Sequence, residues 1–138
     1  MSVLIVEDEE AILNGLIAAL TPEYTVIVAQ TSQDAVRQFT DYRHYIDLLI
    51  SDVSLSAGLS GVELARRFRE EVAGLPVILI SARQPSLWSE RDTSNLNWLG
   101  PHSLAFLQKP FSVAELLANT RRLMRAEHAP LRATRRGY

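Results

Sequence analysis

The sequence contains no cysteine, and Lys109 is the only lysine among its 14 basic residues. The lack of cysteine excludes disulfide bonds, thiolate metal sites, iron–sulfur clusters and cysteine nucleophiles, and it permits a reducing compartment. No apolar stretch reaches the about 18 residues that a transmembrane helix needs. The first apolar run, Val3–Val6, follows no basic segment of the kind that opens a secretory signal. We therefore expect a cytoplasmic protein without membrane insertion.

Glycine and proline are also scarce, at 6 residues each, whereas 47% of the 138 residues are hydrophobic. This composition and length are typical of one globular domain, so no separate catalytic or DNA-binding domain is expected. Charge is uneven: residues 1–118 carry 8 basic and 15 acidic side chains, and residues 119–138 carry 6 arginines and one acid. We expect a domain over residues 1–128 and a flexible basic tail over residues 129–138, without nucleic acid as its partner.

Short apolar runs rich in β-branched residues recur along the chain and predict five strands. They are Val3–Val6, Tyr24–Ala29, Ile46–Ile50, Val77–Ile80 and Leu104–Leu107. Most of these runs are continuous, which is typical of parallel strands that are covered on both faces. Because parallel crossovers are right-handed, the alternation of strands and helices predicts an open α/β sheet with helices on both sides.

The helices between these strands are predicted from apolar spacing and from their first residues. Apolar residues recur at helical spacing after the first strand, and capping-box pairs open three later helices. These pairs are Thr31 with Asp34, Ser60 with Glu63, and Ser112 with Glu115. The segment 85–101 shows no sustained period, so its helix stays undecided. The last helix is expected to end near Glu127.

Residues that can do chemistry follow the predicted strands at their carboxyl ends. Glu7 and Asp8 follow the first strand, Asp52 the third, Ser81 the fourth and Lys109 the fifth. Ligands of open α/β sheets bind at this edge. Carboxylates gathered there need a cation, and hard oxygen ligands without histidine or cysteine favour Mg²⁺. The acids could also be no more than the favourable first turn of a helix.

Four segments, in this order along the chain, resemble the receiver domain of bacterial two-component response regulators. They are Val3–Glu9 (VLIVEDE), Asp47–Leu55 (DLLISDVSL), Ile78–Ala82 (ILISA) and Phe106–Phe111 (FLQKPF). The resemblance covers nearly the whole chain. It implies a single-domain, chemotaxis-regulator-like receiver with a doubly wound (βα)5 flavodoxin-like sheet in strand order 2-1-3-4-5.

The resemblance implies that Asp52 is the phosphoacceptor and receives a phosphoryl group from a histidine kinase or a histidine phosphotransfer protein. It also implies a Mg²⁺ site formed by Glu7, Asp8, Asp52 and the backbone carbonyl of Ser54. Such a protein is a signalling receiver that catalyses only its own phosphorylation and dephosphorylation. It signals by changing its affinity for a separate effector protein.

Three further roles follow from the same resemblance. Lys109 would stabilise charge on the phosphoryl oxygens, and its bond to Pro110 is commonly cis in the family. Ser81 would donate a hydrogen bond to the phosphoryl group, and Phe106 would then turn inward. Phe106 has no hydroxyl, so a hydrogen-bonded outward state is not expected.

The sequence departs from the family in several places. Ser56 stands where proline is frequent, and Gly61 lies one residue further from Asp52 than in many members, which indicates an enlarged loop. The chain between Ser81 and Lys109 is longer than usual in the family by about six residues. Loops of this length are often functional. Residues at the positions of Ser54 and Arg83 tune dephosphorylation in the family.

Two other classes of function remain as alternatives. A degenerate receiver would act as a phosphorylation-independent interaction module, and the rebuilt segment 85–101 motivates this reading. An enzyme of related architecture, such as a phosphatase with an aspartate nucleophile or a flavin-binding protein, fits less well. Such a phosphatase needs a second aspartate two residues after its nucleophile, where this chain has Ser54. For a flavin-binding protein, the turn after the first strand is acidic and therefore unsuited to binding the flavin phosphate.

Overall fold

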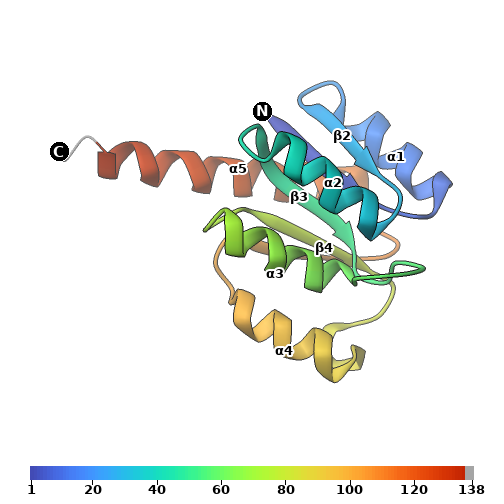
Figure 1. Ribbon diagram of the computed structural model, residues 1–138. Helices are drawn as coiled ribbons and strands as arrows, with labels where there is room; N and C mark the ends of the chain where they lie inside the picture. The colour runs from blue at the N-terminus through green and yellow to red at the C-terminus, as the bar shows by residue number, and fades with distance from the viewer. Residues whose placement is uncertain (136–138) are drawn as a thin grey trace.

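A five-stranded parallel sheet organises the chain (Figure 1), and the strands lie in the order β2-β1-β3-β4-β5. The computed structural model describes the backbone of residues 1–135 and the side chains of residues 1–125. The strands are β1 (Ser2–Val6), β2 (Thr25–Ala29), β3 (Ile46–Asp52), β4 (Val77–Ser81) and β5 (Leu104–Gln108). The predicted flavodoxin-like α/β fold and its strand order are confirmed.

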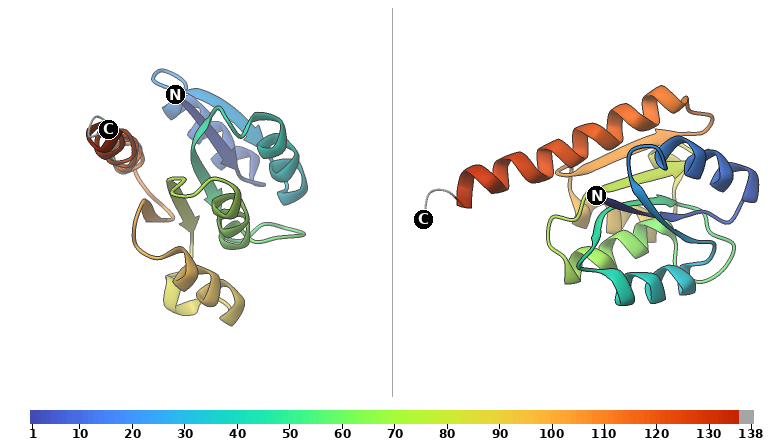
Figure 2. Two further views of the ribbon diagram at one scale, coloured as in Figure 1. Left: turned by 60° about the vertical axis from the view of Figure 1, so that its left-hand side comes forward. Right: turned by 90° about the horizontal axis from the view of Figure 1, so that it is seen from above.

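Helices cover both faces of this sheet (Figure 2), as continuous apolar strands require. The helices are α1 (Glu10–Leu20), α2 (Ser32–Tyr42), α3 (Gly61–Glu71), α4 (Glu90–Leu99) and α5 (Val113–Arg135). Side chains of α2, α3 and α4 pack into one apolar cluster, and those of α1 and α5 pack into another on the opposite face. Phe39 of α2 and Phe68 of α3 stack with ring centroids 4.0 Å apart and are both buried.

The predicted helix starts at Ser60 and Ser112 are confirmed by reciprocal hydrogen bonds. Ser60 Oγ accepts from Glu63 N at 3.1 Å, while Glu63 Oε1 accepts from Ser60 N at 3.0 Å. Ser112 and Glu115 form the same pair of contacts at 3.0 and 3.3 Å. Thr31 contributes half of the motif, because its hydroxyl accepts from the backbone amide of Asp34. Each cap is worth about 1 kcal/mol to its helix.

The undecided segment before β5 contains a short 3-10 turn (Pro85–Leu87) followed by α4. Ser89 caps α4 by accepting from Asp92 N at 3.1 Å. Only Leu99 of this helix is buried. Polar contacts attach α4 to α3, such as Ser60 Oγ donating to Asp92 Oδ1 at 2.5 Å. A helix held by polar contacts has no wide apolar stripe, which explains why periodicity did not reveal it.

The predicted end of the last helix near Glu127 is wrong, because α5 continues to Arg135. The added stretch contains several alanine and arginine residues, which favour helix. Pro130 removes one backbone hydrogen bond but leaves its neighbours helical. The predicted flexible tail includes residues 136–138, which lie outside the described residues, and the boundary at residue 128 stays a prediction. Within residues 1–135, no helix is both long and apolar enough to cross a membrane.

Candidate functional site

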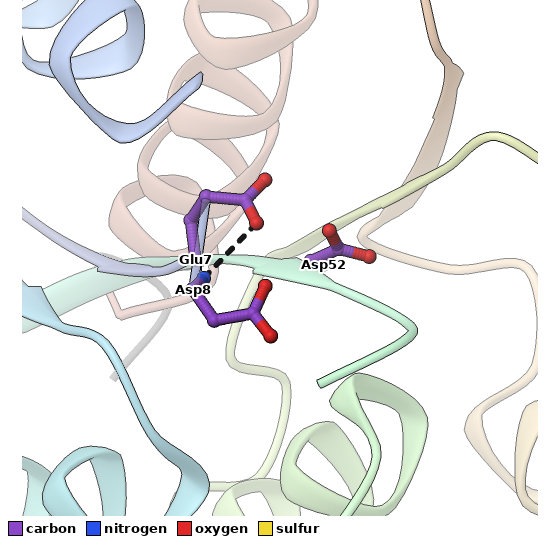
Figure 3. Close-up of side chains that lie close together, drawn as sticks. All are labelled: Glu7, Asp8 and Asp52. Carbon is purple, nitrogen blue, oxygen red and sulfur yellow. Dashed lines mark hydrogen bonds between the residues drawn. The ribbon is translucent and has the colours of Figure 1, made fainter. Parts of the chain in front are cut away.

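Three carboxylates meet at the carboxyl edge of the sheet, where β1 and β3 end next to each other. Glu7 and Asp8 follow β1, and Asp52 ends β3. One oxygen from each lies within 4.8 Å of the others, and Figure 3 shows the three side chains grouped around one space. Glu7 and Asp52 are buried, with 0% and 4% of their surface exposed. Burial of several like charges requires neutralisation by a proton or a cation.

The Glu7 carboxylate is held on one side only. Its Oε2 atom accepts from the backbone amides of Asp8 at 3.0 Å and Glu9 at 3.3 Å. Its Oε1 atom is buried and accepts no hydrogen bond, although Lys109 Nζ lies 3.2 Å away as an ionic contact. Burial, and then the nearby Asp52 carboxylate, raise the pKa of Glu7 from 4.5 to about 7. Without a metal ion, the Glu7 carboxyl group therefore keeps its proton up to about pH 7.

Lys109 supplies the positive charge of the site. Its Nζ atom donates to Asp52 Oδ2 at 2.6 Å and lies 3.7 Å from Glu9 Oε1. Its backbone amide donates to the Ser81 carbonyl at 2.9 Å, and its peptide bond to Pro110 is cis. Burial alone would lower the pKa of Lys109, but Asp52 and Glu7 outweigh it and the net shift is upward. The ammonium group therefore stays charged at neutral pH.

The loop between β3 and α3 fixes the remaining carboxylate oxygens through its backbone. Ser54 N donates to Asp52 Oδ1 at 2.9 Å, and Ser56 N donates to Asp8 Oδ2 at 2.9 Å. A proline at position 56 would have no amide hydrogen to donate. The departure from the family at this position thus adds a contact to Asp8. The expected ligand role of the Ser54 carbonyl stays a prediction.

Gly61 begins α3 directly against the backbone of Asp52. A Cβ atom at position 61 would lie 2.1 Å from the Asp52 carbonyl oxygen and 2.8 Å from Ser51 Oγ. The Gly61 amide donates to the Val53 carbonyl at 3.0 Å. The enlarged loop therefore still brings the start of α3 into contact with the end of β3, and it leaves Asp52 among the other acids.

Ser81 ends β4 and Phe106 lies on the neighbouring strand β5. Ser81 is buried at the end of β4, and its hydroxyl accepts from Arg83 N at 3.0 Å. Phe106 is half-buried, and its ring meets Trp88 edge-on with centroids 5.6 Å apart. Their roles toward a phosphoryl group stay predictions. The structure thus groups the side chains of Glu7, Asp8, Asp52 and Lys109, and Ser81 adjoins this group through its backbone carbonyl.

Two contacts of the site were not predicted from the sequence. Glu9 belongs to the acidic run 7–10, but nothing in that run shows which of its acids reaches Lys109. The contact of Ser56 with Asp8 is made by its backbone amide, so the residue type at position 56 does not reveal it. Both contacts depend on the path of the loops and not on residue type.

The donor set suits a hard divalent cation. Three carboxylates that lie together, with the buried Glu7 Oε1 lacking a hydrogen bond, exceed the charge that one ammonium group can balance. Mg²⁺ binds through one or two carboxylates and completes its coordination shell with water and other oxygens. The acidic cluster of Glu7, Asp8 and Asp52 could therefore hold such an ion.

Comparison with known proteins gives the same family over most of the chain. A family model described as "Response regulator receiver domain" matches residues 3–121. The response regulator ArlR of Staphylococcus aureus is 31% identical over 126 residues, which cover 91% of this chain and 53% of ArlR. The chain thus spans about half the length of the curated relatives it matches.

Solved structures share the fold. The signal receiver domain of an HD domain-containing protein from Pseudomonas fluorescens is 26% identical with a TM-score of 0.77, covering 93% of this chain and 97% of that one. A receiver protein from Sinorhizobium medicae has a TM-score of 0.78 at 24% identity, covering 91% and 95%. The chemotaxis protein CheY4 of Vibrio cholerae has a TM-score of 0.73 at 23% identity, covering 88% of this chain and 97% of that one. This chain therefore belongs to the response regulator receiver domains, the signalling modules of two-component systems.

Proposed function

We propose that this chain is a phosphoacceptor receiver in which Asp52 accepts a phosphoryl group from a histidine kinase or a histidine phosphotransfer protein. The observation that carries this proposal is the contact of 2.6 Å between Lys109 Nζ and Asp52 Oδ2, within a group of buried carboxylates. This arrangement combines a nucleophile, a positive charge and a cation-binding donor set in one place.

Asp52 is the nucleophile of the proposed reaction. One of its carboxylate oxygens attacks the phosphorus of a phosphohistidine, so that an O–P bond forms as the N–P bond breaks and the imidazole leaves with the bonding pair. The product is an aspartyl phosphate. Hydrolysis by water then returns the carboxylate and inorganic phosphate. The chain in this way catalyses only its own phosphorylation and dephosphorylation.

The other side chains stabilise charge around the phosphoryl group. Phosphoryl transfer spreads negative charge over the equatorial oxygens, so placed positive charge contributes most of the catalysis. Lys109 meets this need as a compact ammonium group. Glu7, Asp8, Asp52 and the Ser54 carbonyl would hold Mg²⁺, which when bound neutralises the carboxylates and the phosphoryl oxygens. Ser81 donates its hydroxyl hydrogen to a phosphoryl oxygen.

Signalling follows from a changed affinity for a separate effector protein once Asp52 is modified. Receiver domains act with histidine kinases and effector domains, and ArlR is longer than the part that this chain matches. The proposed partners are accordingly a phosphodonor protein and an effector that distinguishes the two states of Asp52.

The test is intact mass after incubation with phosphoramidate, with Mg²⁺ or with a chelator. We expect one phosphoryl group with Mg²⁺, none with chelator and none in Asp52→Asn. Asp47→Asn is the matched control, because Asp47 lies at the start of β3 and bonds only the Ser2 amide among the contacts described for it. Labelling of Asp52→Asn would contradict the assignment. A chain that takes no label from small donors or from phosphohistidine proteins would instead be a phosphorylation-independent interaction module.

A further inference from the structure

Three consecutive contacts join Ser81 to Phe106 through the segment between β4 and α4. Ser81 Oγ accepts from Arg83 N at 3.0 Å. The carbonyl of Arg83 accepts from Trp88 Nε1 at 3.1 Å. The ring of Trp88 then meets Phe106 edge-on, at 5.6 Å between centroids and an interplanar angle of 72°. A change at Ser81 can thus reach Phe106 without passing through the sheet.

Trp88 supplies a polar atom that Phe106 lacks. The phenylalanine ring on β5 has no hydroxyl group and therefore cannot form a hydrogen bond that depends on its position. The indole N–H of Trp88 does form one, and its ring contacts Phe106. The pair of side chains therefore combines an apolar contact with a hydrogen bond to the segment that follows Ser81.

The helix that follows Trp88 is attached to α3 along its length. Ser60 Oγ donates to Asp92 Oδ1 at 2.5 Å near its start, and Arg66 lies 4.7 Å above the ring of Trp98. At its end, Arg69 Nη1 donates to the Leu99 carbonyl at 2.9 Å. These contacts favour movement of residues 82–88 over movement of α4.

Space for such movement lies beside the two rings. A pocket of about 430 Å³ is lined by Trp88 and Phe106, together with Pro85, Leu96 and Pro101 among others. The exposed side chain of Leu87 shows that the 3-10 turn itself is loosely covered. The pocket therefore gives both rings open space to move into, while both also pack against the apolar cluster of α2, α3 and α4.

We propose that Trp88 is a positioning residue that transmits the state of Ser81 to Phe106. This inference rests on the proposed function, since it describes how modification of Asp52 is passed on. When Ser81 turns toward a phosphoryl oxygen, its hydroxyl leaves the amide of Arg83. The segment 82–88 then shifts, the bond from Trp88 Nε1 to the Arg83 carbonyl breaks, and both rings change their exposure.

The first measurement uses the unmodified protein and does not depend on phosphorylation. In a Trp98→Phe background, the ¹⁵N-labelled indole of Trp88 gives one N–H signal, whose hydrogen exchange reports its bond to Arg83. We expect Ser81→Ala to accelerate this exchange about five- to tenfold, the equivalent of about one net hydrogen bond. Ser86→Ala is the matched control, because Ser86 is exposed in the same segment. Equal exchange rates in Ser81→Ala and Ser86→Ala would overturn the proposal.

The second measurement follows the same signal during phosphorylation with phosphoramidate and Mg²⁺, with intact mass recorded in parallel. We expect the indole signal to shift in proportion to the mass adduct. In Trp88→Phe, Asp52 should take the same label, while a ¹⁹F probe in place of Phe106 loses its response. A full adduct with an unmoved indole signal would overturn the role of Trp88 and leave the proposed function intact. Absence of any adduct would contradict the proposed function, and the exchange measurement would still decide on the contacts of Trp88.

Discussion

Lys109 Nζ donates to Asp52 Oδ2 at 2.6 Å, although the two residues lie 57 positions apart in the sequence. The contact exists because β5 and β3 end at the same edge of a parallel sheet, with β4 between them. The ammonium group faces Glu7 as well, at 3.2 Å. The Lys109 ammonium group thus contacts both buried carboxyl groups, Glu7 and Asp52. In the phosphorylated protein, the same group would balance the negative charge of the phosphoryl oxygens.

Replacing Lys109 by alanine tests this dual role. We expect Lys109→Ala to slow labelling of Asp52 about 10²-fold, the typical loss when one charge-stabilising group is removed. In chelator the variant is also less stable, by about 3 kcal/mol, because buried carboxylates lose their partner. Mg²⁺ should restore much of that stability. Labelling kinetics and urea unfolding check both effects, and unchanged kinetics would refute the role of Lys109.

The raised pKa of Glu7 predicts a pH dependence of stability in the absence of metal. The pKa is 4.5 in the unfolded chain and about 7 in the folded one, so the folded state binds the extra proton. The free energy of unfolding should therefore fall as pH rises from 4.5 to 7, by at most about 3 kcal/mol. Urea unfolding in chelator, compared with Glu7→Gln, isolates this contribution. Glu10→Gln is the control, because Glu10 is exposed and no side-chain contact with the site is described for it.

The same proton links pH to metal binding. Mg²⁺ must displace the proton from Glu7, so its affinity should rise with pH through about 7 and then level off. In Glu7→Gln this rise should disappear. An affinity for Mg²⁺ that is independent of pH between 5 and 8 in the unaltered protein would contradict the raised pKa of Glu7.

Gly61→Ala tests the contact between α3 and the phosphoacceptor strand. The new Cβ would lie 2.1 Å from the Asp52 carbonyl oxygen, so the start of α3 must move away. We expect a loss of stability of about 1–3 kcal/mol and slower labelling of Asp52. Gly15→Ala is the matched control, because a Cβ there meets no atom within 4 Å. That variant should gain up to about 1 kcal/mol as a helical alanine. Equal behaviour of the two variants would rule out the steric argument.

Arg69 is the side chain whose loss should affect the segment after α4 most. Its guanidinium donates to four backbone carbonyls, at Leu75, Leu99, His102 and Ser103, over distances of 2.7–2.9 Å. Arg69→Met removes this donor from the carbonyls of Leu75 and Leu99, whose bonds to Arg69 are buried, and should cost about 2–4 kcal/mol. Thermal unfolding measures the effect. The exposed Arg67 provides Arg67→Met as control, and a loss no larger than in that variant would contradict this account.

The sheet and the position of the site were predictable because both follow from short local segments of the sequence. Continuous β-branched runs such as Val77–Ile80 can only be covered on both faces, and a parallel sheet then brings Asp52, Ser81 and Lys109 to one edge. Ser60 with Glu63 predicted the start of α3 for the same reason, since the capping motif is local. Fold and site were therefore encoded in short segments.

What escaped prediction depends on contacts between segments. The helix α4 is held by Ser60 and Arg66 of another helix, so its own sequence carries little periodic signal. The donation from the Ser56 amide to Asp8 depends on the path of a loop. The helix α5 continues past Glu127 to Arg135, because the residues around Pro130 favour helix strongly enough to tolerate the one lost backbone hydrogen bond.

The most direct test of the central claim locates the phosphoryl group within the chain. After labelling with phosphoramidate and Mg²⁺, borohydride reduces an aspartyl phosphate to homoserine, and peptide mass spectrometry finds the converted residue. We expect conversion of Asp52 alone, and none in chelator. Conversion of Asp8 or another acid, or full labelling with Asp52 unconverted, would contradict that claim.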